Sequence, residues 1–435
     1  MVAEPPIVNP LLIMVLRGAF EAFHGHMFDG RGRDNMPELV SLFSGLGGLD
    51  LGLEAAGWEC VFATDIDPRA IDSLRANKGF RLSNGGRFLQ NADIELADIR
   101  DLTGKDMLSR AGRRRGDITL LAGGPPCQSW SSAGHQLGFD DPRGQLIEEY
   151  LRVAAELDCR YLLFENVRGL VTARGPDGIP GSALAWLRSQ LFVRGWQTYV
   201  ELLNAADYGV PQRRVRVVLV GYRSGDTPRL PAPTHSKYCN LDGLLPWRDL
   251  GNCLAEVETP REEEIIRPTG KLAVELASIP PGSGVKSPGK REATRPGGHW
   301  GYKQGAFVAD LKLPARTVTA NTQQDWVKDP TLGLRKLTPR ECAALQTFPI
   351  GWVVAGNRSD QYRLVGNAVP PQLANAVGSA LLQSLEQVTL PRQWAALAPL
   401  PERLQSAIKY TQREERRNGH SRREAPVKRR TRLTA

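Results

Sequence analysis

The chain of 435 residues lacks any long apolar run. Its longest N-terminal apolar stretch, Leu11 to Leu16, is too short to cross a membrane, and no small-residue cleavage pattern follows it. The sequence therefore predicts neither a transmembrane helix nor a signal peptide. We expect a cytoplasmic protein that makes no contact with a membrane.

Paired cysteines are also missing. The six cysteines are scattered and none forms a C-x-x-C pair, which argues against both a disulfide framework and a zinc site. We therefore expect no metal, and a reducing compartment in which a thiol can stay free. The cysteines are Cys60, Cys127, Cys159, Cys239, Cys253 and Cys342.

Basic charge is scarce outside the C-terminal tail, although the whole chain carries +9. Residues 391–435 hold twelve Lys or Arg and four Asp or Glu, so this tail accounts for +8 of the total. Like charges repel and bury no apolar surface, so we predict a disordered, solvated tail. Non-specific contact with phosphates is the alternative.

One short stretch carries a candidate nucleophile. The apolar run Leu120 to Ala122 predicts a buried strand, and two glycines and two prolines separate it from Cys127. Prolines fix the backbone and glycines allow close approach, so the thiol is presented on a rigid loop at the carboxyl end of a strand. In open α/β sheets, ligands and active-site residues lie at this end of the strands. The alternative is that Cys127 is only a small buried residue.

Two strand-and-helix units earlier in the chain predict a cofactor site. Residues 38–43 read as a strand that runs into the glycine loop 44–48 and a helix, without the full dinucleotide-binding spacing. A second strand ends at Asp65, where a carboxylate can bond a ribose, and Asp67-Pro68 starts the next helix. Asp98 is a third candidate acid, and spacing does not exclude Asp93 or Asp101.

Charged side chains follow the next strands. Tyr161 to Phe164 predicts a strand beside the cysteine loop, with Glu165 at its carboxyl end. Arg214 and Arg216, two residues apart, share one face if the strand 215–222 begins there, and they suit an anionic intermediate. The alternatives are a solvated or ion-paired Glu165 and arginines that protect a sheet edge.

These patterns predict an α/β protein with a doubly wound, Rossmann-like, mostly parallel sheet and a small irregular domain. From residue 231 onward Pro, Gly, Lys and Trp increase and apolar periodicity fades. Thr338, Pro339 and Glu341 predict a capped helix. We expect a loop over 362–371, which enters a last helix at 372–388. The expected parts are an extension (1–37), a catalytic and cofactor-binding domain (38–230), the small domain (231–317), a segment completing the catalytic domain (318–390) and the tail (391–435).

The order of six motifs resembles the cytosine-5 DNA methyltransferase family of bacterial restriction-modification systems. The motifs are Phe43 to Gly48, Gly124 to Gln128, Glu165 to Val167, Gln212 to Arg216, Arg335 to Glu341 and Gly366 to Pro371. The resemblance implies transfer of a methyl group from S-adenosylmethionine to C5 of cytosine in DNA.

The resemblance also implies roles for individual residues. Cys127 adds to C6 of the base, Glu165 bonds its N3 and N4, and Arg214 and Arg216 stabilise the intermediate. The expected cofactor-binding residues are Phe43, Gly45, Gly47, Asp65, Ile66, Asp98, Ile99 and Asn367.

The substrate implied is double-stranded DNA, with the target base flipped out of the duplex and the small domain reading the sequence. We expect a monomer, and a restriction endonuclease that acts on the same DNA sequence. We also expect a lid at His135 to Arg143 that closes over the base. Two alternatives stay open: methylation of cytosine in transfer RNA, and a catalytically silent DNA-binding regulator.

Overall fold

A computed structural model describes the chain from residue 36 onward, with gaps. The described residues are 36–126, 145–223, 227–238, 243–289, 305–385 and 394–423, with side chains as far as 417 in the last range. Glu38 to Ala435 form one unit, to which all of the following applies. No helix in these ranges is both long enough and apolar enough to span a membrane.

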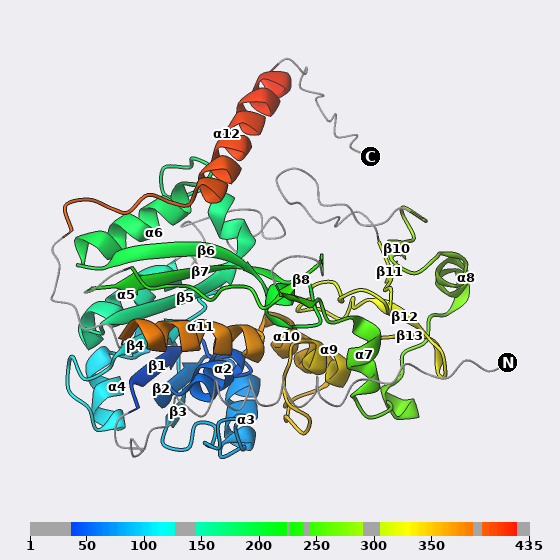
Figure 1. Cartoon of the computed structure of the whole chain (residues 1–435), viewed down its shortest axis with the longest axis horizontal. Coiled ribbons are helices and arrows are strands. Elements are labelled where there is room, and N and C mark those ends of the chain that lie inside the picture. Colours follow the sequence, from blue (N-terminus) through cyan, green and yellow to red (C-terminus); the bar gives the residue numbers. More distant parts are fainter. Residues whose placement is uncertain are drawn as a thin grey trace, which may run out of the picture. The chain divides into compact units, whose positions relative to one another are not determined.

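A seven-stranded sheet organises this unit (Figure 1), with strand order β3-β2-β1-β4-β5-β7-β6. The first five strands are parallel, and β7 is antiparallel to both β5 and β6, as the predicted doubly wound, mostly parallel sheet requires. The strands are β1 (Glu38–Leu42), β2 (Glu59–Asp65), β3 (Asp93–Leu96), β4 (Leu120–Gly123), β5 (Tyr161–Val167), β6 (Gln197–Asn204) and β7 (Val215–Tyr222).

Both faces of the sheet are covered, which explains why its strands are nearly continuous apolar runs. Successive residues alternate between two cores: Leu39 and Leu120 belong to one, Val40 and Leu121 to the other. The helices that cover the sheet are α2 (Gly48–Ala56), α3 (Pro68–Asn77), α4 (Gly104–Ala111), α5 (Gln145–Leu157), α6 (Ser182–Val193) and α11 (Pro371–Leu385).

Two predicted helix starts are confirmed. Asp67 caps α3 by accepting a hydrogen bond from the Arg69 amide, with Pro68 in the first turn. Thr338 and Glu341 form the capping box of α9 (Pro339–Leu345). Each cap involves neighbours along the chain, so the local sequence was sufficient to predict it.

A second sheet, β10-β11-β12-β13, belongs to the smaller region. Its strands β12 and β13 lie beyond residue 317, where the sequence predicted that the small domain ends. Trp326 in β12 pairs with Val308 in β11, so the sheet crosses that boundary. The elements of the region are β8 (His235–Ser236), β9 (Leu245–Pro246), α7 (Leu250–Ala255), α8 (Gly270–Ser278), β10 (Ser283–Gly284), β11 (Phe307–Val308), β12 (Trp326–Asp329) and β13 (Gly333–Lys336).

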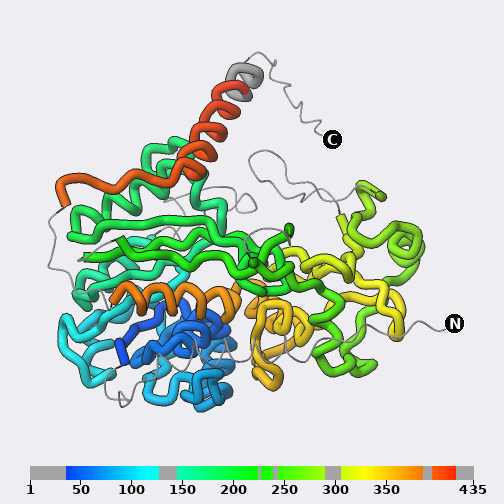
Figure 2. Tube along the Cα trace, in the orientation of Figure 1, coloured from blue at the N-terminus to red at the C-terminus, as the bar shows by residue number. Residues whose placement is uncertain are grey.

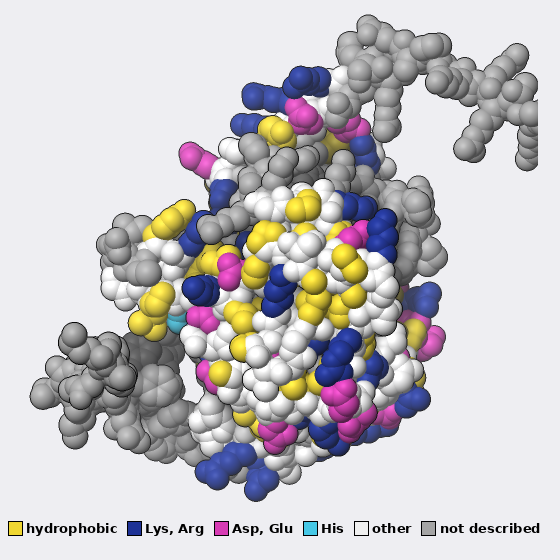
Figure 3. All heavy atoms as spheres, turned by 90° about the vertical axis from the view of Figure 1, so that its right-hand side faces the viewer, with side chains coloured by type: hydrophobic (Ala, Val, Ile, Leu, Met, Phe, Trp, Pro, Cys, Tyr) yellow, Lys and Arg dark blue, Asp and Glu magenta, His cyan; other side chains and the backbone are white. Residues whose placement is uncertain are grey.

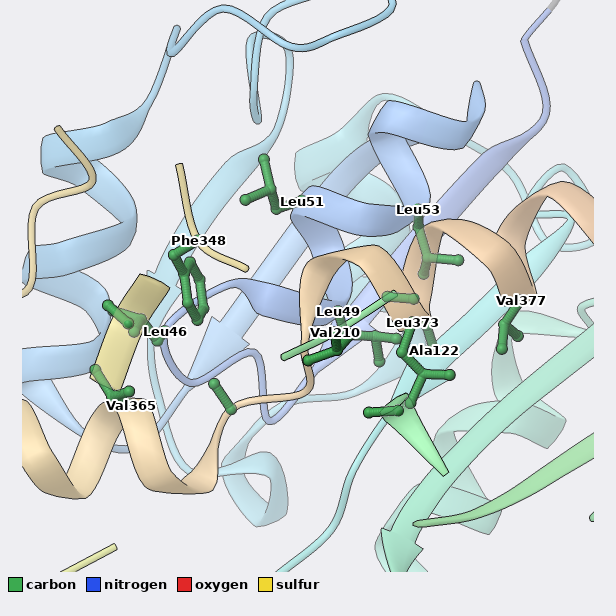
Figure 4. Close-up of a cluster of buried hydrophobic side chains, with 14 of the residues drawn as sticks. Leu46, Leu49, Leu51, Leu53, Ala122, Val210, Phe348, Val365, Leu373 and Val377 are labelled. Atoms are coloured by element: carbon green, nitrogen blue, oxygen red, sulfur yellow. The ribbon is translucent and has the colours of Figure 1, made fainter. Parts of the chain in front are cut away.

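The chain then returns to the first glycine loop, and Figure 2 shows α11 in orange beside α2 in blue. Two glycines of α2 allow this approach. A Cβ atom on Gly48 would lie 2.1 Å from the Val369 carbonyl oxygen, and one on Gly52 2.3 Å from that of Pro371. Figure 4 shows the result, a buried cluster of side chains from the glycine loop, α2, β4, α10 and α11.

Two expectations about the C-terminal part were wrong. The predicted loop over 362–371 is helical as far as Asn367, because α10 (Arg358–Asn367) is capped by Asn357 and buries Tyr362, Leu364 and Val365. The tail, for which we predicted disorder, contains α12 (Glu402–Arg423). Leu404 of α12 is fully buried among the hydrophobic residues on one face of the main sheet, and this contact stabilises helix in a strongly charged segment.

Candidate active site

The candidate site lies along one edge of the main sheet, at the carboxyl ends of its parallel strands. The strand order reverses between β1 and β4, which are parallel neighbours. From β1 the chain continues to β2 on one side of this pair, and from β4 it continues to β5 on the other side. In open α/β sheets this switch point is where ligands bind. Among the described residues, the sequence-predicted Phe43, Asp65 and Glu165 lie at or directly after the carboxyl-terminal parts of β1, β2 and β5.

The glycine loop after β1 has a backbone that few residues adopt. Phe43, Gly45 and Gly47 have positive φ angles of 57°, 55° and 80°. Glycine meets this demand without strain, whereas Phe43 stores strain, a feature that clusters at ligand sites. The Gly45 amide donates a hydrogen bond of 2.8 Å to Oδ2 of Asp65, so the loop is tied to the end of β2.

Asp65 and Ile66 lie where the sequence predicted a ribose and an adenine. Asp65 also accepts a hydrogen bond of 2.8 Å from the Asp67 amide, yet burial raises the pKa of its carboxyl group. Carboxylate oxygens have further lone pairs for a ribose hydroxyl. Ile66 is 62% exposed, and Leu96, paired in register with Asp65, is 44% exposed. Sequence reasoning missed Leu96, and the signal that could have found it is an apolar side chain at a strand end.

Asp98 and Ile99 follow β3 but do not present two side chains to a ligand. Asp98 caps the short 3-10 helix η2 (Ile99–Asp101) and pairs with Arg100, which lowers the pKa of Asp98. Ile99 is buried in the core. Its main chain, together with the Asp98 carboxylate, is therefore the part of this turn suited to the edge of a purine ring.

Asn367 reaches the same edge from the end of α10, and its side chain is exposed. The residue before it, Gly366, lies against the backbone of Thr319, where a Cβ atom would meet the carbonyl carbon at 2.2 Å. The residues after it lie against Gly48 at the start of α2. Backbone packing thus brings Asn367 close to the glycine loop, although the two are far apart in the sequence.

The loop after β4 contacts the end of β5 directly. Asn166 donates a hydrogen bond of 3.1 Å from Nδ2 to the Pro125 carbonyl oxygen and so holds this loop. Gly124 allows close packing, because its Cβ would lie 3.1 Å from Oε2 of Glu165. Cys127, which follows Pro126 in the sequence, and the predicted lid at 135–143 lie outside the described residues.

Glu165 is buried and faces two arginines. Its Oε1 lies 3.0 Å from Nε of Arg216. Burial raises the pKa of Glu165, and the positive charges of Arg216 and Arg214 lower it, with burial the stronger effect. The carboxyl group therefore holds a proton more readily than an exposed glutamate does.

Arg214 has contacts that the sequence did not indicate. The residue precedes β7 and is 1% exposed. Its Nη1 donates to the Val318 carbonyl oxygen at 3.1 Å, and Nη2 donates to those of Gly366 at 2.9 Å and Ala368 at 2.8 Å. Arg214 thus holds the returning segment that carries Asn367, while Arg216 pairs with Glu165.

Within the described ranges, no group of three or more His, Cys, Asp or Glu side chains is arranged to hold a metal ion. The four cysteines described (Cys60, Cys159, Cys253 and Cys342) are all buried, and burial raises the pKa of each thiol. None of these four is suited to act as a nucleophile.

Comparison with known proteins agrees with this geometry. Residues 38–383 match the family model described as C-5 cytosine-specific DNA methylase. The chain is 31% identical to the type II methyltransferase M1.HphI of Haemophilus parahaemolyticus over 79% of its length and 86% of the relative. It is 32% identical to M.PspPI of Psychrobacter sp. over 80% of its length and 79% of the relative. The solved structure of S. pombe Dnmt2 methyltransferase, 19% identical, has the same fold, with a TM-score of 0.55 over 81% of this chain and 99% of that one.

Proposed function

Because the chain belongs to the C-5 cytosine-specific DNA methylase family, it is an enzyme that methylates C5 of cytosine in DNA, and we propose that Cys127 and Glu165 carry the chemistry. The observation that supports this most directly is the packing of Gly124 against the Glu165 carboxylate. It brings the acid beside the loop that continues into Cys127. Two groups that act on one base need this proximity.

Cys127 acts as the nucleophile in this proposal. C5 of cytosine is a poor nucleophile, so electrons must first be pushed into the ring. The Cys127 thiolate adds to C6, which forms a carbon–sulfur bond and makes C5 reactive. After methylation C5 loses its proton to a base, the carbon–sulfur bond breaks and the thiolate leaves.

Glu165 stabilises the charge that this addition creates. A protonated carboxyl group donates a hydrogen bond to N3, and its second oxygen accepts one from the N4 amine. The raised pKa of Glu165 favours the protonated form. Arg216, at 3.0 Å from Glu165, holds the carboxyl group in place and adds positive potential near the ring. Arg214 supports the site by holding the segment from Gly366 to Ala368.

The family uses S-adenosylmethionine, which supplies an electrophilic methyl group when bound. The residues at the edge of β1, β2 and β3 fit such a group. Asp65 offers carboxylate oxygens for ribose hydroxyls, and Ile66 with Leu96 offers exposed apolar surface for the adenine ring. Phe43, Gly45 and Gly47 shape the loop for the methionine part, Asp98 and Ile99 face the purine edge, and Asn367 closes the site from the C-terminal segment.

The remaining features of the proposal concern the DNA. A base inside a duplex cannot reach Glu165, so the target cytosine of double-stranded DNA is flipped out. Residues 231–317, extended by β12 and β13, read the surrounding sequence. The restriction-modification relatives support a restriction endonuclease that acts on the same site. We further propose a monomeric protein of the cytoplasm.

A covalent trap tests the assignment of Cys127. Duplex DNA with 5-fluorocytosine at the target cannot lose a proton from C5, so the wild-type enzyme with S-adenosylmethionine should remain attached to it, as seen on a denaturing gel. Cys127→Ser should form no adduct and lose at least about 10³-fold in turnover. The matched variant Cys253→Ser, at a buried thiol in α7, should form the adduct normally. An adduct that persists in Cys127→Ser would refute the assignment.

A further inference from the structure

Helix α12 lies outside the part of the chain that matches the family model, which ends at residue 383. It is nevertheless fixed to the catalytic unit. Leu404 is buried, and Ala407 and Ile408 pack against the same core. Gly181, just before α6, touches Ile408 so closely that a Cβ atom would lie 2.5 Å from Cγ2 of that side chain.

Polar contacts extend this attachment along the helix. Arg403 donates a hydrogen bond of 2.6 Å to the Leu202 carbonyl oxygen, and Gln412 donates one of 2.9 Å to that of Pro180. Further along, Arg174 pairs with Glu415. The first half of α12 is therefore held at a defined angle to the sheet, from which it projects in Figure 1.

The outward face of α12 is basic. Lys409, Arg413 and Arg417 are four residues apart, so they lie in one row, and all three are exposed. Arg416 flanks this row and is also exposed. Three acids are described on the same helix. Glu402 is in the first turn, Glu415 pairs with Arg174, and Glu414 forms an ion pair of 3.7 Å with Arg417, so it offsets part of the charge at the end of the row.

This basic row begins near the catalytic edge. Helix α12 packs on η4 (Arg168–Thr172), the turn that directly follows Glu165 to Val167. The pKa of Arg168 is lowered by burial and, second, by the positive charge of Arg403. Glu201 and Asp207 offset some of that charge near Arg403. In Figure 3, Lys and Arg side chains lie at the top of the molecule, where α12 lies, with a few Asp and Glu side chains among them.

We propose that the outward face of α12 (Lys409, Arg413, Arg416 and Arg417) binds the phosphates of duplex DNA outside the methylated site. The proposal rests on DNA as the substrate. Bound phosphates release counterions from the duplex, which gives affinity without sequence preference. The exposed Tyr410, 44% accessible, adds a hydroxyl donor of the kind that phosphates accept. The tail thereby lengthens the footprint of the enzyme on DNA.

Charge reversal in the full-length chain tests this proposal. The double variant Lys409→Glu with Arg413→Glu changes the row without touching the anchored face. Its control is Lys105→Glu with Arg114→Glu, two exposed residues near the amino ends of the strands, where the neighbouring Arg113 pairs with Glu38 of β1. Both variants change the net charge equally. Affinity is measured between about 50 and about 200 mM salt for duplexes of about 15 and about 40 base pairs centred on the target.

We expect the α12 variant to bind the long duplex about 10-fold more weakly at low salt, with a salt slope smaller by about 2, one unit for each lost phosphate contact. The short duplex, the control variant and turnover at saturating DNA should change by less than about 2-fold. An equal loss in both variants, or a loss independent of duplex length, would overturn the proposal.

Binding to anionic phospholipid vesicles distinguishes a DNA-binding row from a membrane surface. If the α12 variant lost affinity for the vesicles but kept its affinity for the long duplex, the row would be a membrane surface and the proposal would be wrong. The covalent trap reports on a separate point. If the wild-type enzyme formed no adduct with 5-fluorocytosine DNA, the assignment of Cys127 would fail, and the length-dependent loss of DNA affinity would still test α12.

Discussion

The two halves of the catalytic edge are built differently. On the cofactor side, at β1, β2 and β3, the site consists mainly of backbone turns, such as the glycine loop whose Gly45 amide bonds Asp65. On the base side, at β4, β5 and β7, it consists of buried ionisable side chains: Glu165, Arg216 and Arg214. Backbone turns bind a constant ligand at little cost in desolvation, whereas the proposed addition to cytosine develops charge on the ring, which preorganised arginines and a protonated carboxyl group can stabilise.

The base side should be the more sensitive to a change of one side chain. Glu165→Gln keeps the shape and can still donate a hydrogen bond to N3, but an amide cannot transfer a proton to N3 as negative charge develops there, so we expect turnover to fall about 10²- to 10⁴-fold. In the proposed mechanism protonated Glu165 is the active form, so wild-type turnover should fall as pH rises through its raised pKa. That limb of the pH profile should be missing in the variant. Glu59→Gln, at the start of β2, should behave like wild type.

Arg214 tests whether a buried charge on the base side also holds the fold together. Arg214→Met would remove a donor from the carbonyl groups of Val318, Gly366 and Ala368, of which Ala368 keeps a hydrogen bond of 3.2 Å from Gln346. We expect urea denaturation to report a loss of about 3 to 5 kcal/mol. Arg194→Met, an exposed arginine after α6, should change stability by no more than about 0.5 kcal/mol. A similar small effect at Arg214 would mean that backbone packing alone holds the segment.

Asp50 is an exception on the cofactor side, because it is a buried ionisable side chain among backbone turns. It is completely buried in α2, and burial raises its pKa to about 6. The folded state binds this proton more tightly than the unfolded state. Ionisation of buried Asp50 therefore lowers the free energy of unfolding. This loss of stability is absent below pH 3.8 and increases until about pH 6.

The substitution Asp50→Asn removes that loss of stability. At pH 8 we expect it to raise the free energy of unfolding by about 2 to 3 kcal/mol over wild type, and at pH 4 by little. Burial raises the pKa of Glu54 to about 8, and the charge of Asp50 raises it further, so removing that charge lowers the Glu54 pKa and adds to the gain in stability at pH 8. Asp72→Asn, at an exposed carboxylate, serves as the control. A stability difference that did not depend on pH would show that ionised Asp50 is not the cause.

The smallest effect is expected at the adenine surface. Ile66→Ala removes exposed apolar area that a bound adenine would cover, worth about 1 kcal/mol, so S-adenosylmethionine should bind about 5-fold more weakly in a calorimetric titration. Turnover of this variant with saturating cofactor should equal that of wild type. Val193→Ala removes apolar area at another exposed site, at the end of α6, and should leave cofactor affinity unchanged. Equal affinities in both variants would remove Ile66 from the cofactor site.

Local features were predicted well because their partners are neighbours along the chain. The caps at Asp67 and Thr338 act within three residues. The strands at 38–42 and 120–123 carry apolar runs that suit a parallel sheet covered on both faces. The positions of Asp65 and Glu165 at one edge followed from strand direction alone.

Other features depend on partners far away in the sequence. The backbone contacts of Arg214 span more than 100 residues, and no pattern around 214 indicates them. The pairing of β12 with β11 crosses a boundary that composition suggested. Helix α12 is stabilised by burying Leu404, although its own charges predicted disorder.

The sequence by itself determined the order of the motifs, the parallel sheet and the chemistry available at its edge, because these follow from short patterns of apolar, glycine and charged residues. Only the tertiary structure decided which arginine pairs with Glu165 and which one holds the C-terminal segment. It also decided that exposed Leu96 pairs in register with Asp65 and that the tail carries a basic helix face. Such choices depend on which distant groups become neighbours when the chain is buried, and burial also sets the pKa of Glu165 and Asp50.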